Sequence, residues 1–143
     1  MKDQPIPGPC VCSFLRRTAR SVSSLYDHFL AATGLTVTQY AVLARIGRAD
    51  GVSVSTLADN MGMDRTTLTR NLRPLERRRL VSSKAGADRR ERLLRLTPSG
   101  RTQVEKSYPL WERAQSLMLS RLGDQRWKQL QNLLTAAEDA ATV

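Results

Sequence analysis

The sequence predicts a mainly α-helical protein that carries one small β-hairpin. Apolar residues recur at steps of three and four over several long stretches, which is typical of amphipathic helices. Two short segments flank one polar turn, which is typical of a hairpin. The composition, 41% hydrophobic but only 5% aromatic, suits helices packed through Leu, Val and Ala. A chain of 143 residues is long enough for one domain around one core.

The N-terminal part of the chain predicts a lead-in followed by two helices. Residues 1–9 are expected to be disordered because Pro5, Pro7, Gly8 and Pro9 break regular structure. A long amphipathic helix is predicted within residues 10–34 and ends at Gly34. Thr36 or Thr38 can cap the next helix, and Gly47–Gly51 is expected to break it.

The central part predicts a helix-turn-helix and then the hairpin. Residues 52–54 are expected to be extended, and Ser55 to cap a brief helix that ends at Met61. Gly62 makes the turn, and Asp64 caps a helix that runs to about Arg79, with Pro74 inside it. The hairpin has strands at 80–84 and 91–96, joined by a turn at 85–90.

The C-terminal part predicts two further helices within residues 98–143. Thr97 caps the first, with Pro98 well placed in its first turn, and Pro109 is expected to interrupt it. Asp124 is expected to cap the last. Helices therefore flank a compact centre, residues 36–97, on both sides.

The charge is strongly basic and lies mostly in one segment. The chain has a net charge of +10 and a pI near 10.8. Residues 63–101 hold twelve basic and four acidic side chains, a net +8 of that total. Such an excess predicts an anionic partner, either nucleic acid or an acidic membrane surface. No apolar run reaches the ~20 residues that cross a bilayer, and the first residues lack the apolar segment of a secretory signal, so a cytoplasmic protein without a membrane partner is expected.

The helix after Asp64 is the candidate DNA-reading helix. A helix fits the major groove, where arginine pairs with guanine and threonine contacts a thymine methyl or a phosphate. With Leu68 and Leu72 facing the core, the candidate DNA-binding residues on this helix are Arg65, Thr66, Thr67, Thr69, Arg70 and Arg73. The ordinary alternative is that these arginines form a solvated surface. The amphipathic spacing and the adjacent hairpin favour DNA binding over that alternative.

The hairpin tip is a second candidate DNA contact. Arg89 and Arg90 stand on a thin hairpin, and an arginine there can enter the minor groove. Asp88 makes little sense beside phosphates and is expected to orient the wing by holding an arginine in place.

Residues 55–100 resemble the MarR family of winged helix-turn-helix repressors. The resemblance rests on residues 55–58, 64–70, 75–78 and 80–81, and on the wing signature Asp88-x-Arg90 followed by Leu96-Thr97-x-x-Gly100. It implies a winged helix-turn-helix lobe at 36–97 and a homodimer formed by the helices at 10–34 and 98–143. It also implies a repressor on a pseudo-palindromic operator, with Arg90 as the minor-groove arginine. The repressor would be released by a small aromatic ligand or by an oxidant that acts at Cys12.

Cys12 resembles the sensor cysteine of one subgroup, the organic hydroperoxide resistance regulators. The context is Cys12-x-x-Leu15, then Arg20-x-Val22 and Tyr26, although Arg16 stands where that subgroup has a second tyrosine. The resemblance implies that Tyr26 activates the thiol. A sulfenate at Cys12 could react with Cys10 or with a partner's thiol, and strain disfavours the bond to Cys10. The alternative is that both cysteines only pack a dimer interface.

Other classes of function find less support. A structural, non-specific nucleic-acid-binding protein remains the alternative, and it would bind duplexes without preferring a site. Neither an enzyme nor a bound cofactor is expected, because the chain shows no nucleophile with its base and no phosphate-binding glycine loop. One histidine and two cysteines are too few for a closed zinc site, so no metal is expected either.

Overall fold

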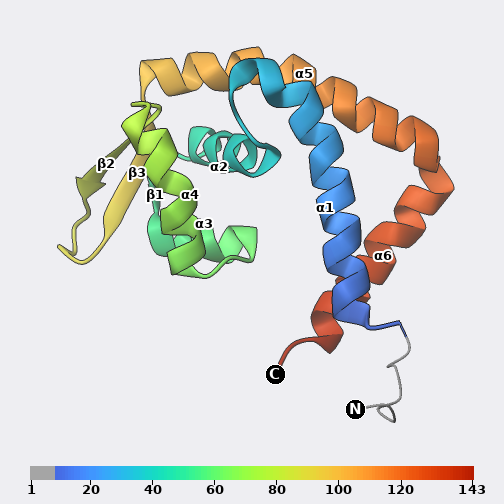
Figure 1. Cartoon of the computed structure of the whole chain (residues 1–143). Coiled ribbons are helices and arrows are strands. Elements are labelled where there is room, and N and C mark those ends of the chain that lie inside the picture. Colours follow the sequence, from blue (N-terminus) through green and yellow to red (C-terminus); the bar gives the residue numbers. More distant parts are fainter. Residues whose placement is uncertain (1–8) are drawn as a thin grey trace, which may run out of the picture.

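The structure is a computed structural model that describes residues 9–143. The disorder predicted for residues 1–9 therefore lies, except for Pro9, outside the described residues. Figure 1 shows a compact lobe and an arm of long helices. The elements in chain order are α1 (Val11–Leu30), the 3-10 helix η1 (Ala31–Thr33), α2 (Val37–Arg48), β1 (Val52–Ser53), α3 (Val54–Met61), α4 (Arg65–Arg77), β2 (Val81–Ala85), β3 (Arg92–Leu96), α5 (Pro98–Leu122) and α6 (Asp124–Ala140).

The predicted fold class is confirmed: a mainly helical chain with a small antiparallel wing. The strands lie in the order β1-β3-β2, all antiparallel. The hairpin pairs Val81 with Leu96 at its base and Ala85 with Arg92 near its tip. The extended segment predicted at 52–54 becomes β1, which pairs Val52 with Leu94, except that Val54 already begins α3. The third strand ties the hairpin to the helix-turn-helix.

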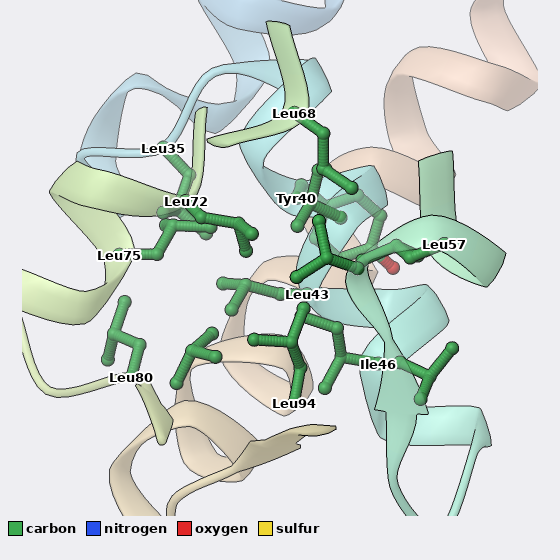
Figure 2. Close-up of a cluster of buried hydrophobic side chains, with 14 of the residues drawn as sticks. Leu35, Tyr40, Leu43, Ile46, Leu57, Leu68, Leu72, Leu75, Leu80 and Leu94 are labelled. Carbon is green, nitrogen blue, oxygen red and sulfur yellow. The ribbon is translucent and has the colours of Figure 1, made fainter. Parts of the chain in front are cut away.

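One apolar core holds the lobe together. Helices α2, α3 and α4 surround it and β3 closes it from below, as Figure 2 shows. Leu68, Leu72 and Leu75 are fully buried, as the spacing of α4 predicts. They meet other fully buried side chains of α2, α3 and β3, namely Val42, Leu43, Ile46, Leu57 and Leu94. Burying each such side chain contributes roughly 1.5–3 kcal/mol to folding.

Local contacts confirm some predicted helix ends and correct others. Thr36 caps α2 in a full capping box with Gln39. Ser53 rather than Ser55 caps α3, because its hydroxyl accepts the amide of Thr56. The break expected at Gly47–Gly51 begins two residues later, since α2 continues to Arg48 and residues 49–51 are irregular. Gly47 serves close packing instead: a β-carbon there would stand 2.8 Å from the side chain of Leu96.

The long C-terminal helices also differ from the prediction. Helix α5 runs unbroken through Pro109, which lies on its exposed side. Water can bond the carbonyl that the proline leaves free, while Ser107 and Ala114 stay buried on the other face. Asp124 is the first residue of α6 rather than its cap. The positive end of the helix dipole stabilises its carboxylate there.

Helices α1, α5 and α6 form the arm that leaves the lobe. Helix α5 arches over the lobe, and α1 and α6 descend from it (Figure 1). Only Leu30 is buried in α1, and no residue is buried in α6. Among the described helices none alone is long and apolar enough to span a membrane; α1–η1 with α2 reach that length and hydropathy only as a pair bent by 71°.

The backbone junction at Gly100 generates the first prediction. A β-carbon at Gly100 would stand 2.9 Å from the carbonyl carbon of Leu80 and overlap its oxygen. Because backbone atoms cannot swing aside, Gly100→Ala is expected to lower the free energy of unfolding by at least about 3 kcal/mol, measured by urea denaturation. Gly62→Ala, where a φ of +61° is the only obstacle, is the control and should cost about 1–2 kcal/mol. Equal losses for the two variants would contradict this account of Gly100.

Candidate nucleic-acid interface

Helix α4 turns a basic and hydroxyl-bearing face to solvent. Its three leucines are buried, so the positions between them point outward. Five of the six residues predicted on this helix line one shallow surface hollow: Arg65, Thr66, Thr69, Arg70 and Arg73. Thr69 is half-buried and the other four are exposed. The structure therefore brings these five together on a single face.

Thr67, the sixth predicted residue, has a structural task. Its amide donates to Asp64 Oδ1 at 2.8 Å, and its hydroxyl donates to Asp64 Oδ2 at 2.7 Å. Asp64 thus caps α4 as predicted. The amide and then the hydroxyl of Thr67 hold the pKa of the Asp64 carboxyl below its ordinary value. The cap fixes the first turn, from which Arg65 and Thr66 project.

The wing tip presents two exposed arginines, Arg89 and Arg90. Asp88 Oδ1 accepts the backbone amide of Arg90 at 3.1 Å, and the Asp88 carbonyl accepts the amide of Glu91 at 2.9 Å. The predicted contact of Asp88 with an arginine is therefore made, but to the main chain of Arg90 rather than to a guanidinium. Asp88 shapes the turn and leaves both side chains exposed.

Several arginines of the basic segment make hydrogen bonds or ion pairs with other parts of the same chain. Arg92 pairs with Glu76 of α4, and Arg95 pairs with Asp50. Arg78 donates to the carbonyls of Gly34 at 3.0 Å and Thr33 at 3.2 Å. Sequence reasoning missed these roles, because the partners lie up to 45 residues away. The basic side chains left for a ligand lie chiefly on α4 and at the wing tip.

The structure does not bring Tyr26 to the two cysteines within one chain. Cys10 and Cys12 are free and exposed at the start of α1. Tyr26 lies fourteen residues after Cys12, which is about 21 Å along the helix, and its hydroxyl donates to Gln115 of α5. No activation of Cys12 by Tyr26 exists inside the single chain among the residues described.

Hydrogen-bond donors at the start of α1 perturb the pKa of Cys10, the residue that precedes the helix. The amide and hydroxyl of Ser13 and the amide of Cys12 hold the pKa of the Cys10 thiol below its ordinary value. The sulfur makes no capping hydrogen bond of normal geometry, so these donors act by proximity at the positive end of the helix. Sequence reasoning placed more weight on Cys12.

Known proteins share both the sequence pattern and the fold. Residues 33–91 match the model of the MarR family. A transcriptional regulator of M. tuberculosis, MosR, solved with DNA, is 39% identical, with 94% of this chain and 100% of that chain covered and a TM-score of 0.82. The chain belongs to the MarR family.

Two further relatives agree with this assignment. The HTH-type transcriptional regulator YdgJ of Bacillus subtilis (strain 168) is 32% identical over 107 residues, which span 74% of this chain and 65%, just under two thirds, of that protein. BpsR of Bordetella bronchiseptica, whose DNA binding is regulated by 6-hydroxynicotinic acid, is 25% identical, with 92% and 99% of the two chains covered and a TM-score of 0.80.

The MarR wing signature has a physical reason in this chain. Thr97 caps α5 through the amide of Gly100 at 3.0 Å, and its own amide donates to the Leu80 carbonyl at 3.1 Å. Gly100 leaves room for that carbonyl. The signature therefore encodes the contact between the base of the wing and the scaffold.

The Asp64 cap generates the second prediction. The pKa of Asp64 is lowered in the folded state, so its stabilisation is full above the ordinary carboxyl pKa of about 4 and is lost as the pH falls through the folded value. Asp64→Ala is expected to lower Tm at pH 7, and the difference from wild type should shrink below about pH 4. Thermal unfolding followed by circular dichroism between pH 3 and 7 measures both.

Asp64→Asn is the matched control for the cap. Asparagine keeps an accepting oxygen at the cap without a titrating charge. This variant should stay close to wild type in Tm at low pH. A gap between wild type and Asp64→Ala that is the same at pH 3 and pH 7 would show that the charge of Asp64 contributes nothing.

Proposed function

We propose that this chain is a sequence-specific double-stranded-DNA-binding transcription regulator that acts as a homodimeric repressor. The observation that carries the proposal is the exposed face of α4, where three arginines and two threonines line one hollow. On the same lobe the hairpin holds Arg89 and Arg90 at its tip. A capped helix with such a face fits a major groove, and a thin basic hairpin fits the neighbouring minor groove.

Each group of residues has its own role in this proposal. Arg65 and Arg70 lie near the N-terminus of α4, the end that reaches base edges, and can each pair with a guanine. Thr66 and Thr69 contact thymine methyls or phosphates, and Arg73, further along, contacts the backbone. Arg90 enters the minor groove, while Asp88 orients the wing through the main chain.

The arm supports the homodimer. An apolar groove runs between α1, α5 and α6, lined by side chains that include Phe14, Val22, Leu119, Trp127 and Leu134. Phe14 is 56% exposed and Leu134 39% exposed, so this chain leaves the groove uncovered. Exposed apolar surface of this extent marks an interface. A second copy seated in the groove would cover it in both chains and present two copies of α4 to a pseudo-palindromic operator.

The proposal includes an effector that releases the protein from its DNA. A hollow between α2 and α5 is lined by Tyr40, Arg48, Arg101 and Tyr108, with Glu105 at its edge. Two cations beside two aromatic rings suit a small aromatic carboxylate. BpsR, whose DNA binding is regulated by 6-hydroxynicotinic acid, supports this class of ligand.

An oxidant is the second class of effector. Cys10 and Cys12 are exposed, and the lowered pKa of Cys10 favours the reactive thiolate. A thiolate attacks an organic hydroperoxide at its terminal oxygen, which breaks the O–O bond, leaves a sulfenate and releases the alcohol. Both thiols lie in the arm, so their oxidation would act on the dimer rather than on the DNA-reading face.

The third prediction concerns the reading of DNA. On the duplex that lies directly upstream of the chain's own coding sequence, Arg65→Ala or Arg70→Ala is expected to reduce the preference over a scrambled duplex about ten-fold, the worth of one bidentate base contact. Arg90→Ala should weaken binding and lower the slope of log K against log salt by about 0.9. Fluorescence anisotropy titrations measure all three, and their stoichiometry should be two chains per duplex.

Arg126→Gln supplies the control for this experiment. It removes the same charge from the exposed surface of α6, a helix of the arm. It should leave both the preference and the salt slope near wild type. Equal affinity of the wild type for upstream and scrambled duplexes would favour a non-specific nucleic-acid-binding protein instead.

The fourth prediction separates the two classes of effector. Cumene hydroperoxide is expected to release wild type from the upstream duplex, while Cys10→Ser/Cys12→Ser stays bound. The single variants Cys10→Ser and Cys12→Ser then assign the thiol attacked. Release of the double variant by the peroxide would show that the oxidant does not act through these thiols. The hollow at Arg48 and Arg101 would then be the remaining effector site, and titration of the protein–DNA complex with benzoate analogues tests it.

A further inference from the structure

Toward the tip of the wing, Arg92 is the last of the described residues whose side chain makes a hydrogen bond or ion pair with the helices of the lobe. Side chains alternate along a strand, so Arg92 shares the inner face of β3 with Leu94 and Leu96. Leu94 is fully buried and Leu96 half-buried, whereas Arg92 is exposed. Apolar support for the hairpin therefore ends at Leu94. Beyond it, the arginines at the tip depend on the direction in which the hairpin leaves the core.

Glu76 meets Arg92 at this point. It follows the buried Leu75 near the end of α4 and is itself half-buried. Its carboxylate pairs with the guanidinium of Arg92. The same guanidinium nitrogen donates to the hydroxyl of Ser83 on β2 at 3.1 Å. One arginine thus joins the DNA-reading helix to both strands of the wing.

We infer that the Glu76–Arg92 pair positions the wing against α4, so that Glu76, an acidic residue, strengthens DNA binding. The inference rests on the proposed function. An exposed ion pair contributes little to global stability. Here its effect is geometric, because a tilt of the hairpin at Arg92 is carried out to Arg90 at the tip, whereas α4 keeps its place through its buried leucines.

The direction in which Glu76→Gln changes the affinity for DNA tests this inference. If Glu76 were only a negative charge near phosphates, Glu76→Gln would relieve repulsion and tighten binding. As a positioning residue, Glu76→Gln is expected to weaken binding to the upstream duplex about two- to five-fold, the size set by an exposed ion pair. Tm should stay close to wild type, so the loss of affinity would not come from unfolding.

Glu91→Gln is the matched control. Glu91 is an exposed acidic residue of the wing whose carboxylate takes part in no hydrogen bond or ion pair found within residues 9–143. Its neutralisation should leave the Kd unchanged or lower it. In an Arg92→Gln background, Glu76→Gln should no longer weaken binding, because the pair is already broken. Tighter binding by Glu76→Gln in the wild-type background would overturn the inference.

A readout without DNA keeps this test independent of the proposed function. Trypsin cuts after Arg89 or Arg90 faster when the turn at the tip opens locally. Glu76→Gln is expected to speed this cleavage at the tip in the free protein, and Glu91→Gln is not. If the wild type shows no preference for the upstream duplex, the proposed function fails and cleavage decides the inference. Equal cleavage of wild type and Glu76→Gln would overturn it.

Discussion

The contact between Gly100 and the carbonyl of Leu80 is the constraint on which the rest of the lobe depends. At this point the end of α4, both strands of the wing and the start of α5 come within hydrogen-bonding distance of one another. The Leu80 carbonyl accepts the amide of Thr97, and the Thr97 hydroxyl donates to the Arg79 carbonyl at 2.6 Å. Arg79 has a φ of +56°, the sharp turn that lets β2 follow α4 directly. Close backbone approach thus fixes the base of the wing.

A second set of contacts joins the base of the wing to the arm. Arg78, directly before the turn, donates to the carbonyls of Thr33 and Gly34, where α1 and η1 end. Gln103 of α5 donates to the same Thr33 carbonyl at 2.8 Å. Unpaired carbonyls at a helix end favour such cationic and amide donors. The end of α4 therefore rests on the end of the first arm helix, so a change in the arm has a direct route to α4.

Features that depend on local periodicity were predicted well, and those that depend on tertiary contacts were not. The leucines of α4 and the alternation of the hairpin follow from regular spacing, so the exposed face of α4 could be located. Ser53 and Ser55 are equally good caps locally, and the choice falls to Ser53 because it ends the β1 pairing with Leu93. Pro109 does not stop α5, since burial on the opposite face outweighs one lost hydrogen bond.

The same distinction explains how the basic segment is divided. From the sequence its arginines form one charge excess, and only folding separates those left exposed from those that pair within the protein. Arg92 and Arg95 lie on opposite faces of β3 and pair with acidic residues of α4 and of the loop before β1. Arg90, two residues before Arg92, remains exposed at the tip. Position along the hairpin therefore divides the two tasks: Arg92 and Arg95, on β3, pair with acidic residues and hold the wing, while Arg90, in the turn, stays exposed.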